Sequence, residues 1–371
     1  MFLTTAVKIG FLVNPVSGMG GRVGLKGTDG AATQRRAEAL GAERSSPSRA
    51  VLALRSIDRN LSAVFLTCSG DMGRDELDAV KLPSETVYVR QEHTTRKDTQ
   101  AAAKRFLDEK VDLILFAGGD GTARDILEVV GDHVPILGIP AGVKMQSAVF
   151  ALTPEEVGGL LASYALSGTL RDGEVLDVDE DGFRRGEVRA KLYGVARVPD
   201  APGVQSGKQA YHSGSSDDEA AEIAQYIVDS MDEDVLYIIG PGSTTARIGE
   251  AMGQKKTLLG VDAYVGRSPL RLDASEKDLL SVLEKHDGPA EIIVTPIGAQ
   301  GFFFGRGNQQ ISPDVIRRVG PENVVVVATP SKLNGTPTLR SDTGDAALDR
   351  SLSGKRRVVT GYKRRRLVEV G

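Results

Sequence analysis

The sequence predicts an α/β protein with an N-terminal doubly wound parallel sheet and a second, β-rich α/β domain. Leu113 to Ala117 is a continuous apolar run, too short for a helix, and it is typical of a strand buried on both faces. Apolar runs of this kind alternate with helical patterns between Val7 and Ser167. From about Leu170 the pattern alternates in β fashion. We therefore expect two domains, at residues 1–168 and 169–371.

Each expected element follows from a local pattern of apolar, glycine and polar residues. In the first domain we expect strands at 7–13, 50–54, 63–68, 85–89, 113–117 and 134–139, and helices at 32–40, 94–107, 123–130 and 153–167. In the second we expect a hairpin over 173–198, strands at 235–239, 291–295 and 324–328, and a terminal hairpin over 356–370 that turns at Thr360 and Gly361. The terminal hairpin is a candidate to pack back on the first domain.

The central strand is followed by Gly118-Gly119-Asp120-Gly121-Thr122. The glycines allow a tight turn that lies close to a ligand, and Thr122 is a candidate cap for the next helix. Unpaired N–H groups at a helix N-terminus favour phosphate. Asp120 carries the only charge on this turn, and it suits holding Mg²⁺ or accepting a proton from an attacking hydroxyl. This turn therefore predicts a phosphorylated ligand, with Asp120 as catalytic and metal-binding residue.

A second phosphate-loop candidate follows the first strand, where the sequence is Asn14-Pro15-Val16-Ser17-Gly18. The spacing nearly imitates a dinucleotide fingerprint, but Val23 stands where the third glycine is required, so a Rossmann dehydrogenase is disfavoured. Arg22 and Lys26 in the glycine-rich extension suit phosphate oxygens. A solvated loop is the alternative interpretation of that extension.

Further candidate residues lie after later strands. Lys144 follows Pro-Ala-Gly142 and is a plausible phosphate contact. The run from Val235 to Gly249 repeats the strand, glycine turn and helix pattern. The candidate cofactor contacts in the second domain are Gly242, Ser243, Thr244, Arg306 and Asn308, and Arg247 could also hold a phosphate or carboxylate. The planar groups of Arg306, Asn308 and Gln309 are candidates for part of the substrate pocket.

Composition excludes several classes of protein. The 371 residues carry a formal net charge of −4, which gives no general attraction to nucleic acid or to anionic membranes. Cys68 is the only cysteine, and the four histidines lack metal-ligand spacing. We find no signal peptide pattern and no apolar run of about 20 residues. We expect a soluble, cytoplasmic protein without nucleic-acid or membrane partners, and a homo-oligomer is possible.

Gly118-Gly-Asp-Gly-Thr resembles the signature of the superfamily that joins NAD kinases, diacylglycerol and sphingosine kinases and 6-phosphofructokinases. Asn14-Pro-Val-Ser-Gly resembles its opening motif, and Pro140-Ala-Gly also resembles the superfamily. Met145-Gln146 stands where lipid kinases have an Asn-Asp pair. Nearly the whole chain resembles the ATP-NAD kinase-like family that includes the acetoin-catabolism X protein. Gly240-Pro-Gly-Ser-Thr and Gly305-Arg-Gly-Asn-Gln-Gln also carry this resemblance.

The resemblance implies an α/β nucleotide-binding kinase domain followed by a β-rich acceptor domain. It implies phosphoryl transfer from ATP, or from polyphosphate, to the adenosine ribose hydroxyl of NAD, with Mg²⁺ and with Asp120 in the catalytic position. The acceptor pair of classical NAD kinases cannot be placed, so another small-molecule hydroxyl stays open as acceptor. A non-catalytic nucleotide sensor is a further alternative, although Asp120 weighs against it because a carboxylate facing phosphates needs Mg²⁺. The segment 199–218 is either a lid or a surface loop.

Overall fold

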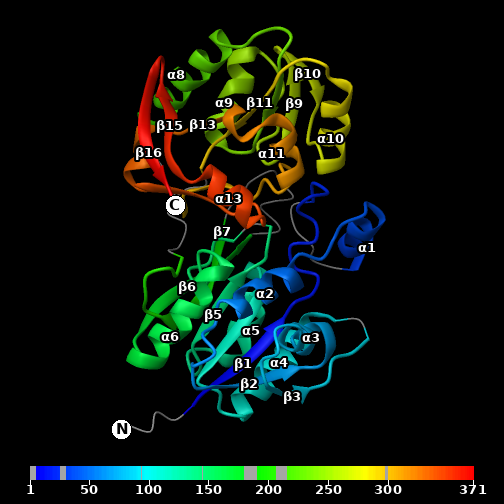
Figure 1. Ribbon diagram of the computed structural model, residues 1–371, viewed down its shortest axis with the longest axis vertical. Coiled ribbons are helices and arrows are strands. Elements are labelled where there is room, and N and C mark those ends of the chain that lie inside the picture. The colour runs from blue at the N-terminus through cyan, green and yellow to red at the C-terminus, as the bar shows by residue number, and fades with distance from the viewer. Residues whose placement is uncertain are drawn as a thin grey trace. The chain divides into compact units, whose positions relative to one another are not determined.

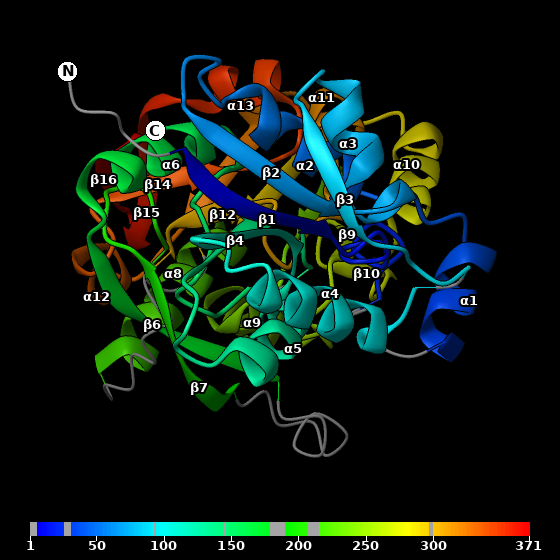
Figure 2. The same ribbon diagram turned by 90° about the horizontal axis from the view of Figure 1, so that it is seen from below.

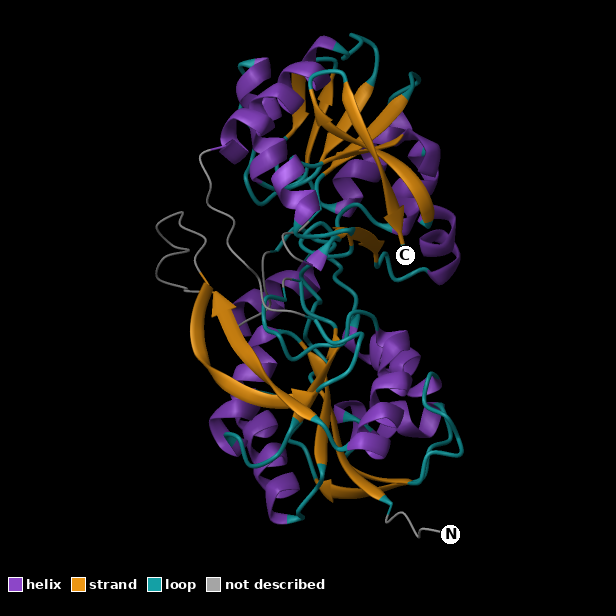
Figure 3. Cartoon of the chain, turned by 90° about the vertical axis from the view of Figure 1, so that its left-hand side faces the viewer, coloured by secondary structure: helices purple, strands orange, loops and turns teal. Residues whose placement is uncertain are grey.

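A computed structural model of the chain describes residues 6–25, 31–92, 94–143, 145–178, 190–205, 215–296 and 300–371. The chain forms two compact units. The first comprises Met1–Met19, Gly27–Arg36 and Glu43–Gly207, and the second comprises Gly20–Lys26, Ala37–Ala42 and Lys208–Gly371. Helices and strands alternate in both units, as Figures 1 and 3 show. Among the described residues, no helix is both long and apolar enough to cross a membrane.

The first unit is built on a parallel sheet with strand order β3-β2-β1-β4-β5. Its strands are β1 (Val7–Val13), β2 (Ala63–Cys68), β3 (Ser84–Tyr88), β4 (Leu113–Gly118) and β5 (Ile136–Pro140). The six residues of β4 are all buried, as expected for the central run. The strand order reverses between β1 and β4, and ligands of such sheets bind at the carboxyl ends of the strands beside that point.

Helices cover both faces of this sheet. One hydrophobic cluster joins the strands to α4 (Arg96–Asp108) and α5 (Asp120–Val130). Another joins them to α2 (Ser46–Arg55), α3 (Arg74–Ala79) and α6 (Val157–Ser167). Figure 2 shows α4 and α5 on one side of β1, with α2 and α3 on the other. The prediction of a doubly wound parallel sheet is confirmed.

Two local predictions are wrong. Residues 50–54 lie inside α2 and not in a strand, because Ser46 begins a helix that has Pro47 in its first turn, a position proline favours. The helix after the central strand begins at Asp120 with Gly119 in the N-cap position, so Thr122 lies inside its first turn instead of capping it. The other expected helices of the first domain form, with α1 at Ala31–Ala39.

The strands β6 (Leu170–Val178) and β7 (Ala190–Pro199) form the antiparallel pair that the sequence assigned to the second domain. The pair is the long curved ribbon of Figure 3. Val175, Ala196 and Val198 belong to the same hydrophobic cluster as α4 and α5, so the pair packs with the first unit. Its expected turn, residues 206–214 of the 199–218 segment and Lys26 lie outside the described residues.

The second unit contains a mixed sheet with strand order β10-β9-β8-β11-β13-β15-β16-β14-β12 in its described residues. The strands are β8 (Leu236–Ile239), β9 (Asp262–Val265), β10 (Ser268–Arg271), β11 (Ala290–Val294), β12 (Phe302–Phe304), β13 (Val324–Val327), β14 (Thr338–Ser341), β15 (Gly354–Gly361) and β16 (Arg364–Val370). The terminal hairpin β15–β16 joins this sheet through β13 and β14. The expected β-rich α/β fold of the second part is confirmed.

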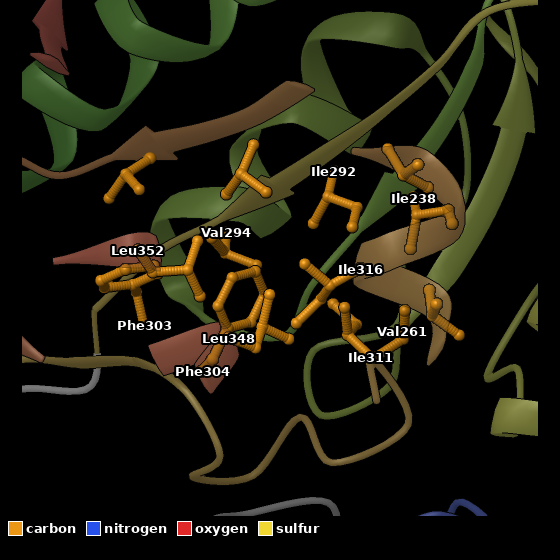
Figure 4. Close-up of a cluster of buried hydrophobic side chains, with 14 of the residues drawn as sticks. Ile238, Val261, Ile292, Val294, Phe303, Phe304, Ile311, Ile316, Leu348 and Leu352 are labelled. Atoms are coloured by element: carbon orange, nitrogen blue, oxygen red, sulfur yellow. The ribbon is translucent and has the colours of Figure 1, made fainter. Parts of the chain in front are cut away.

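Helices also cover the described faces of this sheet. The helices are α8 (Ser215–Asp229), α9 (Ser243–Met252), α10 (Glu276–Lys285), α11 (Pro313–Val319), α12 (Pro330–Asn334) and α13 (Ala346–Leu352). The larger cluster packs α10, α11 and α13 against the strands, and it contains Phe303 and Phe304 (Figure 4). The other cluster contains residues of α8 and α9. The phenylalanines therefore form core, as their apolar run predicts.

Candidate functional site

Three loops meet at the carboxyl edge of the first sheet, after β1, β4 and β5. The backbone N–H of Asn14 donates to the Ala117 carbonyl over 2.9 Å, and the N–H of Ala141 donates to the Gly118 carbonyl over 3.0 Å. The Asn14 side-chain amide donates to the Thr122 hydroxyl over 2.9 Å. Two motifs that lie far apart in the sequence are therefore tied together beside the switch point of the sheet.

Glycine at two positions of these loops is required by how closely the loops approach each other. Gly18 has φ +77°, and a Cβ there would lie 1.9 Å from the Ala141 carbonyl oxygen. A Cβ on Gly119 would lie 3.1 Å from Cα of Gly142 and 3.4 Å from Oγ of Ser17. Pro15 and Ser17 are buried in the same place. The predicted residues of the first unit that the structure describes thus form one contiguous set, whereas Lys144 lies outside the described residues.

Asp120 is the ionisable residue at the centre of this set, and 5% of its surface is exposed. Its Oδ2 accepts a hydrogen bond from the Gln146 N–H over 2.7 Å. Its Oδ1 accepts from the Ser147 N–H over 3.0 Å and from the Ser147 hydroxyl over 2.6 Å. The carboxylate is therefore held in one orientation by the segment that follows β5.

Burial raises the pKa of Asp120 from 3.8 to about 7. The hydrogen bonds from Ser147 and Gln146 oppose that rise because they stabilise the charged form, and the charge of Asp177 adds to it. A carboxyl group with a pKa near neutrality can both hold and release a proton under physiological conditions, which is the property that a general acid or base requires.

The Ser147 hydroxyl can support both protonation states of Asp120. It lies 2.6 Å from Oδ1 of Asp120 and 2.8 Å from the Leu176 carbonyl oxygen, and it accepts from the Leu176 N–H over 3.0 Å. A hydroxyl has one proton to donate. It can donate to Asp120 when that group is charged or carries its proton on Oδ2, and it can turn to Leu176 and accept from Asp120 when the proton is on Oδ1. Both states therefore keep a complete set of hydrogen bonds.

The loop provides a limited but suitable set of oxygen ligands for a cation. An ionised carboxylate has about four acceptor positions, and three of those on Asp120 are used by the protein. The remaining position on Oδ2 suffices for one metal contact. The described residues contain no cluster of three or more His, Cys, Asp or Glu side chains that could hold a metal. Mg²⁺ in nucleotide sites takes one or two carboxylates and completes its shell with phosphate and water, so the residues fit.

The predicted residues of the second unit lie at two places. Gly242, with φ +131°, is the residue before α9, and Ser243 is the exposed first residue of that helix. Thr244 follows in the first turn of α9, and its hydroxyl accepts from the Lys332 ammonium over 3.3 Å. Arg247, on the same helix, pairs with Glu250 and with Asp217.

Arg306 and Asn308 hold the loop that follows β12. The Arg306 guanidinium lies 3.2 Å from the Asp342 carboxylate and 4.6 Å from the centre of the Phe302 ring, and Arg306 is 2% exposed. The Asn308 amide accepts from the Gly305 N–H and donates to the Phe303 carbonyl. Gln309 donates to the Gly305 carbonyl, while Arg22 pairs with Glu276. These contacts fix local structure, and a role of Arg306 and Asn308 in binding a cofactor stays a prediction.

Three residues at the carboxyl ends of strands in the two sheets were not singled out from the sequence. Ser147 orients Asp120, and Thr295 and Lys332 lie with Thr244 at the carboxyl ends of neighbouring strands. Thr295 directly follows β11, and Lys332 follows β13 by a few residues. Their positions after apolar runs were the available signal, since carboxyl ends of parallel strands meet at one edge.

Both units match models of one family of phosphotransferases. Residues 9–167 match the ATP-NAD kinase N-terminal domain, and residues 232–370 match the ATP-NAD kinase C-terminal domain. The chain therefore belongs to the ATP-NAD kinase family. A search of curated proteins found no match.

Among solved structures, the chain is similar to two proteins from Bacillus anthracis str. Sterne that are described as diacylglycerol kinases. They are 16% and 15% identical, with TM-scores of 0.25 and 0.24, over 48% and 47% of this chain and 45% and 46% of theirs. The match thus spans less than half of their length. A benzoate-bound solute-binding protein of an R. palustris ABC transporter is 10% identical, with a TM-score of 0.22, over 94% of this chain and 72% of that one. These TM-scores are too low to carry an argument about function.

Proposed function

We propose that the protein transfers a phosphoryl group from ATP to a hydroxyl group, with NAD as acceptor and NADP as product. Membership of the ATP-NAD kinase family supports ATP as the donor. The observation that carries the proposal is the placement of Asp120, a buried carboxyl group with a pKa raised to about 7, where the loops after β1, β4 and β5 meet. A site of this kind serves proton removal from a hydroxyl nucleophile.

In the proposed mechanism, the backbone N–H groups in the first turn of α5 bind the phosphates, and the loop from Asn14 to Gly18 lies beside them. Asp120 accepts the proton of the acceptor hydroxyl on its remaining Oδ2 position. Ser147 goes on donating to Oδ1, which is still an acceptor in the neutral carboxyl group, and so keeps that group in place. The single open Oδ2 position can contact either the acceptor hydroxyl or Mg²⁺, so Asp120 acts as the base in this mechanism. Mg²⁺, if Asp120 held it there instead, would neutralise charge on the transferring phosphate.

The test is a direct assay of the purified protein with ATP, Mg²⁺ and NAD, read by the appearance of NADP. We expect NADP to form and its formation to require both ATP and Mg²⁺. A parallel panel replaces NAD with other hydroxyl compounds and ATP with polyphosphate. Product from another acceptor but none from NAD would retain the kinase and reject NAD. No product from any pair, with ATP still bound, would support the nucleotide sensor instead.

A further inference from the structure

The second unit contains a group of hydrogen-bond donors that lies apart from Asp120 in the sequence and has no role in the mechanism above. Its members are Thr244 in the first turn of α9, Thr295 after β11, and Lys332 on α12 after β13. The strands β8, β11 and β13 are parallel neighbours in the sheet, with β11 between the other two. Their carboxyl ends therefore bring these three side chains to one edge.

Distances show that the three groups converge. Nζ of Lys332 lies 3.3 Å from Oγ1 of Thr244 and 3.1 Å from Oγ1 of Thr295. Because an ammonium group only donates, both threonine oxygens act as acceptors in these contacts. Thr244 is 3% exposed and Thr295 is 5% exposed, so both hydroxyl groups are almost removed from bulk water.

The two hydroxyl groups are left with donor capacity. In the part of the chain that the structure describes, neither Thr244 nor Thr295 has an acceptor for its own proton. The neighbouring Thr245 differs, because its hydroxyl donates to the Gly242 carbonyl over 3.0 Å. Buried hydroxyl protons that lack an acceptor are unfavourable, and an oxygen-rich ligand would supply acceptors for both at once.

Lys332 is held in place by the elements around it. Its N–H donates to the Thr329 hydroxyl, which caps α12, and the preceding Ser331 hydroxyl donates to the Glu219 carboxylate over 2.9 Å. Thr295 is 5% exposed, so its side chain is also enclosed by the protein. The donors are thus positioned before a ligand arrives, which lowers the entropic cost of binding.

We propose that Thr244, Thr295 and Lys332 form an anion-binding site for the phosphate group of a small phosphorylated metabolite. A phosphate presents several acceptor oxygens to converging donors, and lysine is a common point-charge partner of phosphate. The first turn of α9 adds backbone N–H groups on the same side of the strands. The site lies wholly within the second unit and does not depend on Asp120 or on the proposed kinase activity.

The first experiment titrates the full-length protein with inorganic phosphate and follows chemical modification of individual lysines by mass spectrometry. We expect phosphate to protect Lys332 from reductive methylation, while the exposed Lys277 on α10 stays equally reactive. Acetate at the same ionic strength should not protect Lys332. Absence of protection, or equal protection by acetate, would overturn the assignment of a phosphate site.

The second experiment compares matched variants by equilibrium titration with the same phosphate probe. Lys332→Gln should weaken binding about 10- to 100-fold, since it removes a charge-assisted hydrogen bond, and Thr295→Val should weaken it about 2- to 10-fold. Thr245→Val removes a buried hydroxyl one residue from the site and should leave the affinity unchanged at temperatures where it is folded. If Lys332→Gln, folded by circular dichroism, binds phosphate as the wild type does, the site is wrong.

The two proposals fail separately. Protection of Lys332 by phosphate without NADP formation would leave this site intact and reject the NAD kinase. NADP formation without protection of Lys332 would support the NAD kinase and reject the phosphate site.

Discussion

Each unit presents a set of side chains at the carboxyl ends of its parallel strands, and we call these places the first edge (after β1, β4 and β5) and the second edge (after β8, β11 and β13). The two edges have the same succession of strand, glycine turn and helix, but they carry side chains of opposite charge. In the first unit, a strand, a glycine turn and the start of α5 present the buried carboxyl group of Asp120. In the second, a strand, a glycine turn and the start of α9 lie beside the ammonium group of Lys332. A carboxylate that can take up a proton can act as a general base in catalysis, whereas a lysine among hydroxyl donors can bind an anion. The same strand, turn and helix arrangement thus supports proton transfer in one unit and anion binding in the other, and the side chain at the carboxyl ends of the strands determines which.

The largest expected effect is that of Asp120→Asn, which keeps the size of the side chain and removes its charge. Turnover should fall by about 10²- to 10⁴-fold, the usual loss for a general base, while ATP still binds through backbone donors. Asp125→Asn is the matched control, because Asp125 is also a buried carboxylate of α5 but pairs with Arg96 and Arg124. It should retain turnover. Near wild-type turnover in Asp120→Asn would show that Asp120 is not the general base.

Arg306→Ala should have the second largest effect, which is a loss of folding stability. Removing one partner of a buried ion pair costs about 3–5 kcal/mol, because Asp342 stays behind in a buried position. Arg317→Ala breaks an exposed pair with Asp345 and should cost about 1 kcal/mol or less. Urea unfolding measures both. A stable Arg306→Ala protein with a raised KM for the acceptor would instead make this residue part of the binding site.

A smaller effect should distinguish Gly18, in the loop after β1, from Gly242, in the turn before α9. Gly18→Ala places a Cβ against the Ala141 carbonyl and should destabilise by more than the ~1–3 kcal/mol of left-handed strain alone. Gly242→Ala meets the end of the Thr295 side chain, which can move, so its cost should be less. Gly168→Ala, with φ +62° and nothing within 4 Å of the added Cβ, is the control for strain without contact. Calorimetry in which Gly242→Ala lowers the free energy of unfolding more than Gly18→Ala does would contradict this order.

The first edge could be predicted from the sequence to a large extent because its parts are local. A buried run followed by Gly-Gly-Asp-Gly-Thr fixes both the turn and the position of Asp120 on it. The strand predicted at 50–54 failed because a short apolar run fits a buried helix equally well. Ser147 and Lys332 were missed for a different reason. Each gains its meaning from a partner brought near by strand order, which local patterns do not encode.

The smallest expected effect is a shift of the pH profile in Ser147→Ala. The hydrogen bond from Ser147 lowers the pKa of Asp120 by stabilising its charged form, so its loss should raise that pKa further above about 7. Because the proposed base acts when charged, activity should rise with pH, and the rising limb should move upward by about one pH unit, the equivalent of ~1.4 kcal/mol.

Ser56→Ala is the matched control for this shift. The Ser56 hydroxyl also accepts a backbone N–H, from Gly158, and donates to the backbone carbonyl of Ala53, but it contacts no carboxyl group among the described residues. Its loss should lower stability to a similar degree and leave the pH profile in place. Rates measured from pH 5 to 9 at saturating ATP separate the two outcomes, since a merely structural Ser147 would change the height of the profile and not its midpoint. Equal midpoints in Ser147→Ala and Ser56→Ala would show that the hydroxyl does not tune the carboxyl group of the first edge.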